Sequence, residues 1–81
     1  MTIKSLTLTN IKIIQKQDKN LNTYYIIFSQ DTTNEAYFCF NGTVKNGWKD
    51  FENNWESITE IAFEYEQTEK GNRVINIFNL L

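Results

Sequence analysis

The chain has 81 residues, 41% of them hydrophobic, 15% aromatic and 22% charged, with one Cys, no His, no Pro and a net charge of −2. Because the chain has no His and Cys39 is its one cysteine, it cannot form a structural zinc site, an internal disulfide or a Ser-His or Cys-His nucleophile pair. No apolar run reaches the ~18 to 20 residues of a membrane helix, and residues 1–15 lack the apolar core of a signal peptide. We therefore expect one cytoplasmic, non-enzymatic domain over residues 1–81, without metal or cofactor.

Residues 2–17 predict a long strand that bends near its middle. The apolar positions are even at Leu6 and Leu8 but odd at Ile11 and Ile13. Because side chains alternate along a strand with a period of two, this switch requires an inserted residue or a bend. We expect a bulge at Thr9-Asn10, and a strand that bends in this way can close a small barrel.

Residues 22–30 and 35–41 predict a hairpin around a polar turn at residues 31–34. Pairing about Thr32 sets Tyr24 opposite Phe40 and Ile26 opposite Phe38. The side expected to face the core comprises Tyr24, Ile26, Phe28, Ala36, Phe38 and Phe40. The side expected to face solvent comprises Tyr25, Ile27, Tyr37 and Cys39.

Residues 48–56 predict a short amphipathic helix with Asn46 as its N-cap. Its apolar residues recur at the spacing of one helical face: Trp48, Phe51, Trp55 and Ile58. We expect this face to cover an open end of the barrel, which makes both tryptophans core residues.

Residues 60–66 and 73–81 predict a final hairpin that turns at residues 69–72. Phe63 and Tyr65 are expected to face the core, opposite Ile77 and Ile75 respectively. The order is then three strands, a helix and two strands. It predicts a mainly β protein, a small five-stranded Greek-key barrel of the OB-fold type with one short helix between strands 3 and 4. An SH3-like barrel and a β-grasp fold are the alternatives if the first strand is misread.

The segments YIIFSQDTTNEAYFCF, GWKDF, IAFEYEQTEKG and VINIFNL carry a resemblance that spans nearly the whole chain. In spacing and residue class they resemble the OB-fold domains of small single-stranded nucleic-acid-binding proteins from phages and mobile elements. The resemblance implies that strands 2 and 3 present aromatic rings to bases, beside cations from the first strand. The matching positions are Tyr25 and Tyr37, with Lys12, Lys16 and Lys19 beside them.

The charge is distributed unevenly along the chain. Residues 1–49 carry six lysines against three acids, a net charge of +3, whereas residues 50–81 carry two bases against seven acids, a net charge of −5. A cationic surface on the N-terminal half is therefore compatible with an acidic chain. The alternative is that both halves are simply solvated.

The candidate binding residues are outward aromatic and basic side chains. Tyr25 and Tyr37 are expected to stack on successive bases, with Ile27 between them; the alternative is ordinary cross-strand packing. The basic residues expected to contact phosphates are Lys12, Lys16, Lys19, Lys70 and Arg73, for which the alternative is solubility alone.

The function expected from these residues is binding of single-stranded DNA, or alternatively RNA, with little sequence preference. Replication or recombination of a phage or mobile element is the expected setting, with a homodimer or a replication protein as further partner. The alternative is a small acidic protein-interaction module, either an accessory subunit or an inhibitor that mimics nucleic acid. A carbohydrate-binding barrel is a third possibility.

Overall fold

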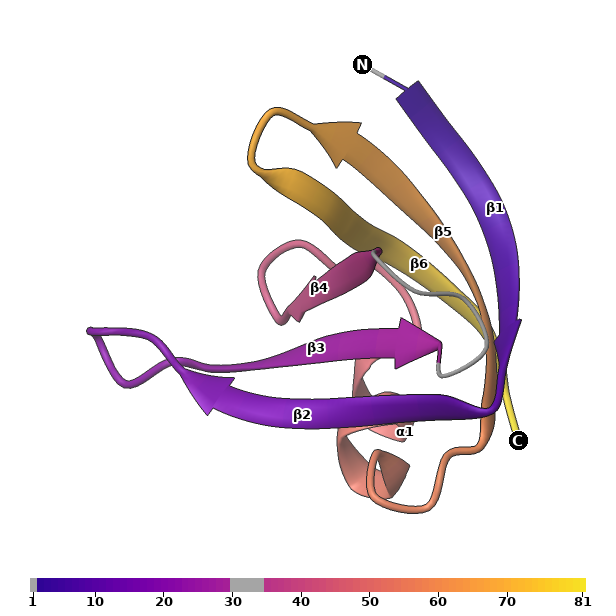
Figure 1. Ribbon diagram of the computed structural model, residues 1–81. Coiled ribbons are helices and arrows are strands. Elements are labelled where there is room, and N and C mark those ends of the chain that lie inside the picture. Colours follow the sequence, from indigo (N-terminus) through magenta and orange to yellow (C-terminus); the bar gives the residue numbers. More distant parts are fainter. Residues whose placement is uncertain (1, 30–34) are drawn as a thin grey trace.

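The computed structural model describes residues 2–29 and 35–81, which form a six-stranded sheet and one short helix (Figure 1). The elements are β1 (Thr2–Thr9), β2 (Ile11–Gln17), β3 (Thr23–Ser29), β4 (Ala36–Phe40), α1 (Trp48–Asn54), β5 (Glu60–Thr68) and β6 (Gly71–Leu80). The mainly β class and the place of the helix are confirmed. No helix in these two segments is long and apolar enough to cross a membrane.

The first predicted strand consists of two strands, β1 and β2, separated by Asn10. Asn10 has a φ of 51°, in the left-handed region that asparagine tolerates better than most residues. The chain turns a corner there (Figure 1), so that Leu8 and Ile11 are both buried despite their opposite parity. The expected bulge is a break between strands.

The expectation of a closed five-stranded barrel is therefore wrong. The strands are hydrogen-bonded in the order β1-β5-β6-β4-β3-β2, which is an open sheet of six strands with β1 and β2 at its edges. All neighbouring pairs are antiparallel except β4 with β6, which is parallel. The two edge strands are consecutive in the chain, and they approach each other at the Asn10 corner.

The pairing of β3 with β4 follows the predicted register, but the two faces are exchanged. Tyr24 lies opposite Phe40 and Ile26 opposite Phe38, as expected, while the predicted turn at residues 31–34 lies outside the described residues. The buried side comprises Tyr25, Ile27, Tyr37 and Cys39, none of them more than 4% exposed. The side predicted to be core is only half-buried and comprises Tyr24, Ile26, Phe28, Ala36, Phe38 and Phe40.

Helix α1 explains which side of β3 is buried. The ring of Tyr25 packs edge-on against Phe51, with 5.1 Å between ring centroids, and contacts Trp48 and Trp55 at 5.7 and 5.4 Å. Its hydroxyl oxygen accepts a hydrogen bond of 3.3 Å from Gln15 Nε2. A tyrosine tolerates burial when its hydroxyl finds such a partner, so the phenol did not have to face water.

The helix and the last hairpin depart from the prediction at their boundaries. The N-cap is Gly47 rather than Asn46, and Gly47 has a φ of 88°. A Cβ there would lie 2.8 Å from Ile77 Cβ, so only glycine fits without a shift. Phe63 pairs with Ile77 as predicted, but a register shift places Tyr65 opposite Val74 instead of Ile75.

The hydrophobic core draws residues from all six strands, the helix and the loops beside it. Its buried members are Leu8, Ile11, Tyr25, Ile27, Tyr37, Cys39, Val44, Phe51, Ile58, Ile61, Phe63, Tyr65, Val74 and Ile77.

Candidate nucleic-acid interface

Three half-buried aromatic rings form a row across β3 and β4, on the face of the sheet that points away from the core; we call this face the outer face. Tyr24 and Phe40 are stacked, with 4.9 Å between centroids and 23° between ring planes. Phe38 follows Phe40 at 6.5 Å and 22°. The aromatic row is thus Tyr24, Phe40 and Phe38, and its rings lie roughly parallel. Such an arrangement offers flat apolar surface to another planar group.

Basic side chains lie on both sides of the aromatic row. On one side β2 places Lys16 opposite Tyr24 and Lys12 opposite Phe28, and both lysines are exposed. On the other side, the parallel pairing of β4 with β6 sets Arg73 beside Phe38. Directly opposed residues in a sheet share a face, so the row lies between cations from two different strands.

The guanidinium of Arg73 also contacts the row itself. Its Cζ lies 6.0 Å from the centroid of the Phe40 ring, within the range of a cation-π interaction. This contact holds a positive charge at the edge of an apolar surface. The combination of ring and guanidinium can receive a base on the ring and a phosphate on the cation.

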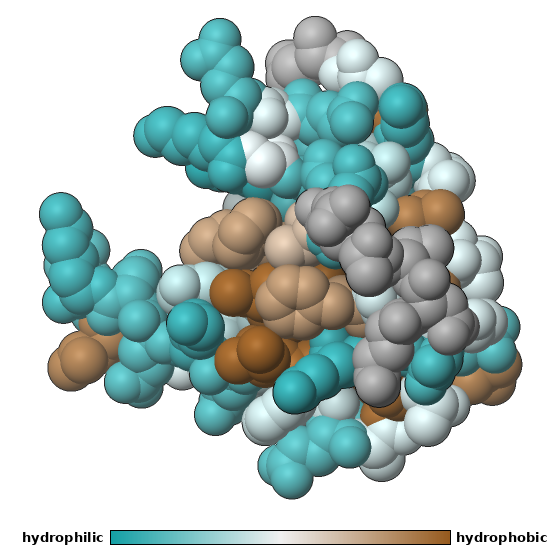
Figure 2. Space-filling model, viewed as in Figure 1, coloured by the Kyte–Doolittle hydropathy of each residue, from teal (hydrophilic) through white to brown (hydrophobic). Residues whose placement is uncertain are grey.

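The rings of the aromatic row line an open hollow of about 290 Å³, together with Asp18, Lys70 and Arg73. Asp18 follows β2, and Lys70 lies in the turn between β5 and β6. The hollow therefore lies between the ends of two hairpins. Figure 2 shows apolar side chains gathered at the centre of this side of the molecule, between hydrophilic projections.

Asp18 holds the turn between β2 and β3 through its carboxylate. Oδ1 accepts hydrogen bonds from the backbone amides of Asn20 at 2.8 Å and Asn22 at 2.9 Å, and Oδ2 accepts one from Asn22 Nδ2 at 3.3 Å. The Asn22 amide, with these other donors, lowers the pKa of Asp18. The carboxylate is therefore charged at neutral pH, at the edge of a hollow that is otherwise lined by rings and cations.

The sequence-predicted site residues divide into two groups. Tyr25, Ile27 and Tyr37 were expected on the surface and are sealed in the core, at 2%, 0% and 4% exposure, so they offer no ring or side chain to a base. The lysines Lys12 and Lys16 lie on the outer face, and Lys70 and Arg73 line the hollow. Lys19 is exposed in the turn between β2 and β3 and is not among the lining residues.

Burial changes the chemistry of two of the inner side chains. Tyr37 packs edge-on against Phe63 and Tyr65, at 5.1 and 4.9 Å, and donates a hydrogen bond of 2.9 Å to Glu35 Oε2. Burial, with this bond, raises the pKa of Tyr37 above its usual range. Burial likewise raises the pKa of Cys39 to about 12, so this thiol stays protonated and serves as core filling.

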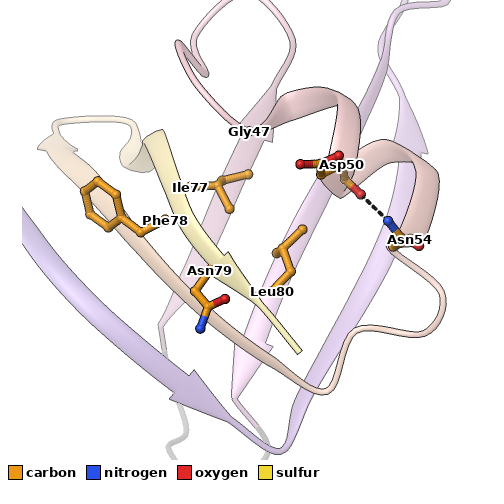
Figure 3. Close-up of a pocket in the computed structure, with 7 residues that line it drawn as sticks. All are labelled: Gly47, Asp50, Asn54, Ile77, Phe78, Asn79 and Leu80. Atoms are coloured by element: carbon orange, nitrogen blue, oxygen red, sulfur yellow. Dashed lines mark hydrogen bonds between the residues drawn. The ribbon is translucent and has the colours of Figure 1, made fainter.

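A second hollow of about 320 Å³ lies beside α1 (Figure 3). Its lining residues are Gly47, Asp50, Asn54, Ile77, Phe78, Asn79 and Leu80. Figure 3 shows the ring of Phe78 directed away from the helix, and this side chain is 61% exposed. The charged member of this lining is Asp50 alone, which would repel a phosphate. The hollow beside α1 is therefore the poorer candidate for binding an anionic polymer.

Comparison with known proteins finds no matching family model and no significantly similar curated protein or solved structure.

Proposed function

We propose that this chain binds single-stranded DNA, with RNA as the second possible ligand, through the outer face of β3 and β4. The observation that carries the proposal is the aromatic row of Tyr24, Phe40 and Phe38, bordered by cations on both sides. Stacking of a base on an aromatic side chain contributes about 1 to 3 kcal/mol and tolerates any base. The expected specificity is therefore weak.

The strand order supports an OB-type arrangement for this domain. The two edges of the sheet, β1 and β2, are consecutive at Asn10, so the pair is equivalent to one bent strand that borders the sheet on both sides. The helix between β4 and β5 covers the inner face through Trp48, Phe51 and Trp55. In OB-folds the corresponding central strands and the flanking loops bind oligonucleotides. The hollow lies in that place.

In the proposed complex, the single strand crosses the hollow between the two hairpin ends. Bases stack on the aromatic row, while Lys16 and Arg73 contact phosphates on either side of it. Tyr25 and Tyr37 pack in the core, whereas the rings of the aromatic row are half-buried and accessible to a ligand. Substituting a ring of the aromatic row should therefore lower the stability of the fold only moderately. The burial of Tyr25, Ile27 and Tyr37 moves the proposed contact from these residues to their neighbours along the same strands.

The test is fluorescence anisotropy with a labelled oligo-dT of about 12 nucleotides, within the length that an OB-fold covers. The wild-type chain is compared with a Tyr24→Ala/Phe40→Ala double variant at low and at moderate salt. We expect the double variant to bind at least about 30-fold more weakly, since two stacking contacts are removed. Salt should weaken wild-type binding because phosphate contacts release counterions.

Phe78→Ala is the matched control, because it removes an exposed aromatic ring that lines the other hollow. It should leave affinity unchanged. Equal affinity of the wild type and the double variant would reject the site. Absence of any binding by the wild type at low salt would reject the function and favour the alternative of a protein-interaction module.

A further inference from the structure

We propose that Asp18 is a specificity-determining residue of the outer-face site, one that favours bases with an exocyclic amino group over thymine and uracil. This inference rests on the proposed function and deepens it. The observation behind it is a carboxylate at the edge of a hollow whose other lining residues are three aromatic rings, a lysine and an arginine.

The position of Asp18 follows from the sheet. The ladder of β2 with β3 continues past Gln17 and Thr23 through the Asp18 backbone amide, which donates a 3.0 Å hydrogen bond to the Asn22 carbonyl. Asp18 therefore has the same parity as Lys16, which lies opposite Tyr24 on the outer face. The carboxylate is held on the side of the sheet that carries the aromatic row.

The carboxylate is also fixed in orientation. Its Oδ1 is engaged by two backbone amides, at 2.8 and 2.9 Å, whereas Oδ2 has one longer bond of 3.3 Å to the Asn22 side chain. A carboxylate oxygen has two lone pairs, so Oδ2 can accept a further hydrogen bond. An acceptor held rigidly in place discriminates between donors better than a mobile one does.

A negative charge beside an anionic polymer is unfavourable unless it contacts a donor on the ligand. The amino groups of cytosine, adenine and guanine are such donors, and a carboxylate that accepts from cytosine N4 is a known mode of base readout. Thymine and uracil present only N3–H at the corresponding edge, between two carbonyl oxygens that repel a carboxylate. The affinity for a base stacked on Tyr24 would thus depend on whether the base presents an amino group or a carbonyl oxygen to Asp18.

The experiment compares labelled oligo-dC and oligo-dU of equal length at neutral pH. Both are flexible pyrimidine strands without a 5-methyl group, so their bases differ at the edge that Asp18 would read. We expect the wild type to bind oligo-dC about five- to tenfold more tightly, the lower part of the range for base readout because Asp18 is only half-buried.

In Asp18→Asn the amide oxygen can still accept from the Asn20 and Asn22 backbone amides, while the second oxygen becomes an NH2 donor. We expect oligo-dU to bind more tightly, because a negative charge is lost without the loss of a contact. Oligo-dC also loses the hydrogen bond from its amino group, so its affinity should not rise to the same extent and the preference for oligo-dC should vanish or reverse. Changes in two-dimensional NMR amide shifts that are confined to residues 17–23 would establish that the sheet and the aromatic row keep their fold.

Glu66→Gln is the matched control. Glu66 lies opposite Arg73 in the sheet, so the change removes a second negative charge from the same face. It should strengthen binding of oligo-dC and oligo-dU equally and leave their ratio intact. Equal affinities in the wild type, or a ratio that Asp18→Asn does not alter, would overturn the inference while leaving the proposed function in place. Failure to bind either oligonucleotide would overturn both.

Discussion

The two faces of the β3–β4 hairpin carry similar side chains in different surroundings. On the inner face, Tyr25 and Tyr37 each contact two or more rings edge-on or at a tilt, and both are buried. On the outer face, Tyr24 and Phe40 are stacked nearly parallel and half-buried. Edge-on contacts interlock rings from different elements, whereas a parallel stack leaves a flat surface open.

This difference divides the hairpin into a side that is sealed in the core and a side that is open to solvent. The inner rings are surrounded by α1, β5 and β6, so their removal leaves a cavity. The outer rings stack on each other beside the Arg73 side chain and are only half-buried. We infer that the inner face supports the fold and that the outer face is available to a ligand.

The largest difference is expected in stability. Tyr25→Ala should lower the free energy of unfolding by about 3 to 5 kcal/mol, the range for removing a buried aromatic ring. Tyr24→Ala should lower it by about 1 kcal/mol, because its ring is only half-buried. Urea denaturation followed by tryptophan fluorescence measures both values.

Tyr25→Phe is the control for the hydroxyl of Tyr25. It keeps the ring contacts with α1 and removes the hydrogen bond from Gln15, so we expect a loss of about 1 kcal/mol. Comparable losses for Tyr24→Ala and Tyr25→Ala would contradict the assignment of the two faces.

The sequence could predict the pairing of this hairpin but not the direction in which it faces. Both faces of β3 and β4 carry apolar side chains, so pairing about the turn gives the register, whereas hydrophobicity leaves the inner side undetermined. The burial is decided by residues far along the chain, since Phe51 of α1 packs on Tyr25 and Phe63 of β5 packs on Tyr37. The side on which Lys12 and Lys16 lie was easier to predict, because the parity of Ile11 and Ile13 marks the opposite side of β2 as the inward one.

The break at Asn10 likewise shows how far the fold could be predicted from the sequence. The switch of parity between Leu8 and Ile11 indicates a bend, and the structure contains one. Whether the bend is a bulge within one strand or a corner between two depends on the backbone conformation of a single residue. The φ of 51° at Asn10 is permitted by its residue type but is not required by it.

The buried thiol of Cys39 makes the stability of the inner face depend on pH. Burial raises the pKa of Cys39 to about 12 in the folded chain, against about 8.5 for an unfolded cysteine. The unfolded chain therefore releases this proton first. This contribution to the free energy of unfolding is fully present below pH ~8.5, and it declines by about 1.4 kcal/mol for each pH unit above that value.

Urea midpoints measured between about pH 7 and pH 10 test this slope. Cys39→Ala should flatten the decline, since no thiol remains to ionise. Tyr37, whose pKa is also raised by burial, adds to the decline only above pH ~10, where an unfolded tyrosine begins to ionise. A wild type and a Cys39→Ala variant with parallel pH dependence would show that the thiol is not held in the core.

The smallest expected effect concerns one lysine beside the aromatic row. If Lys16 neutralises a phosphate of a bound single strand, Lys16→Ala should reduce the slope of log affinity against log salt by about 0.7. Lys49→Ala is the matched control, since Lys49 is also exposed but lies on α1, which covers the inner face. Anisotropy titrations of oligo-dT over a range of salt concentrations give both slopes. Equal slopes for the two variants would mean that phosphates do not follow β2, and the path of the strand would have to cross the hollow between Arg73 and Lys70 alone.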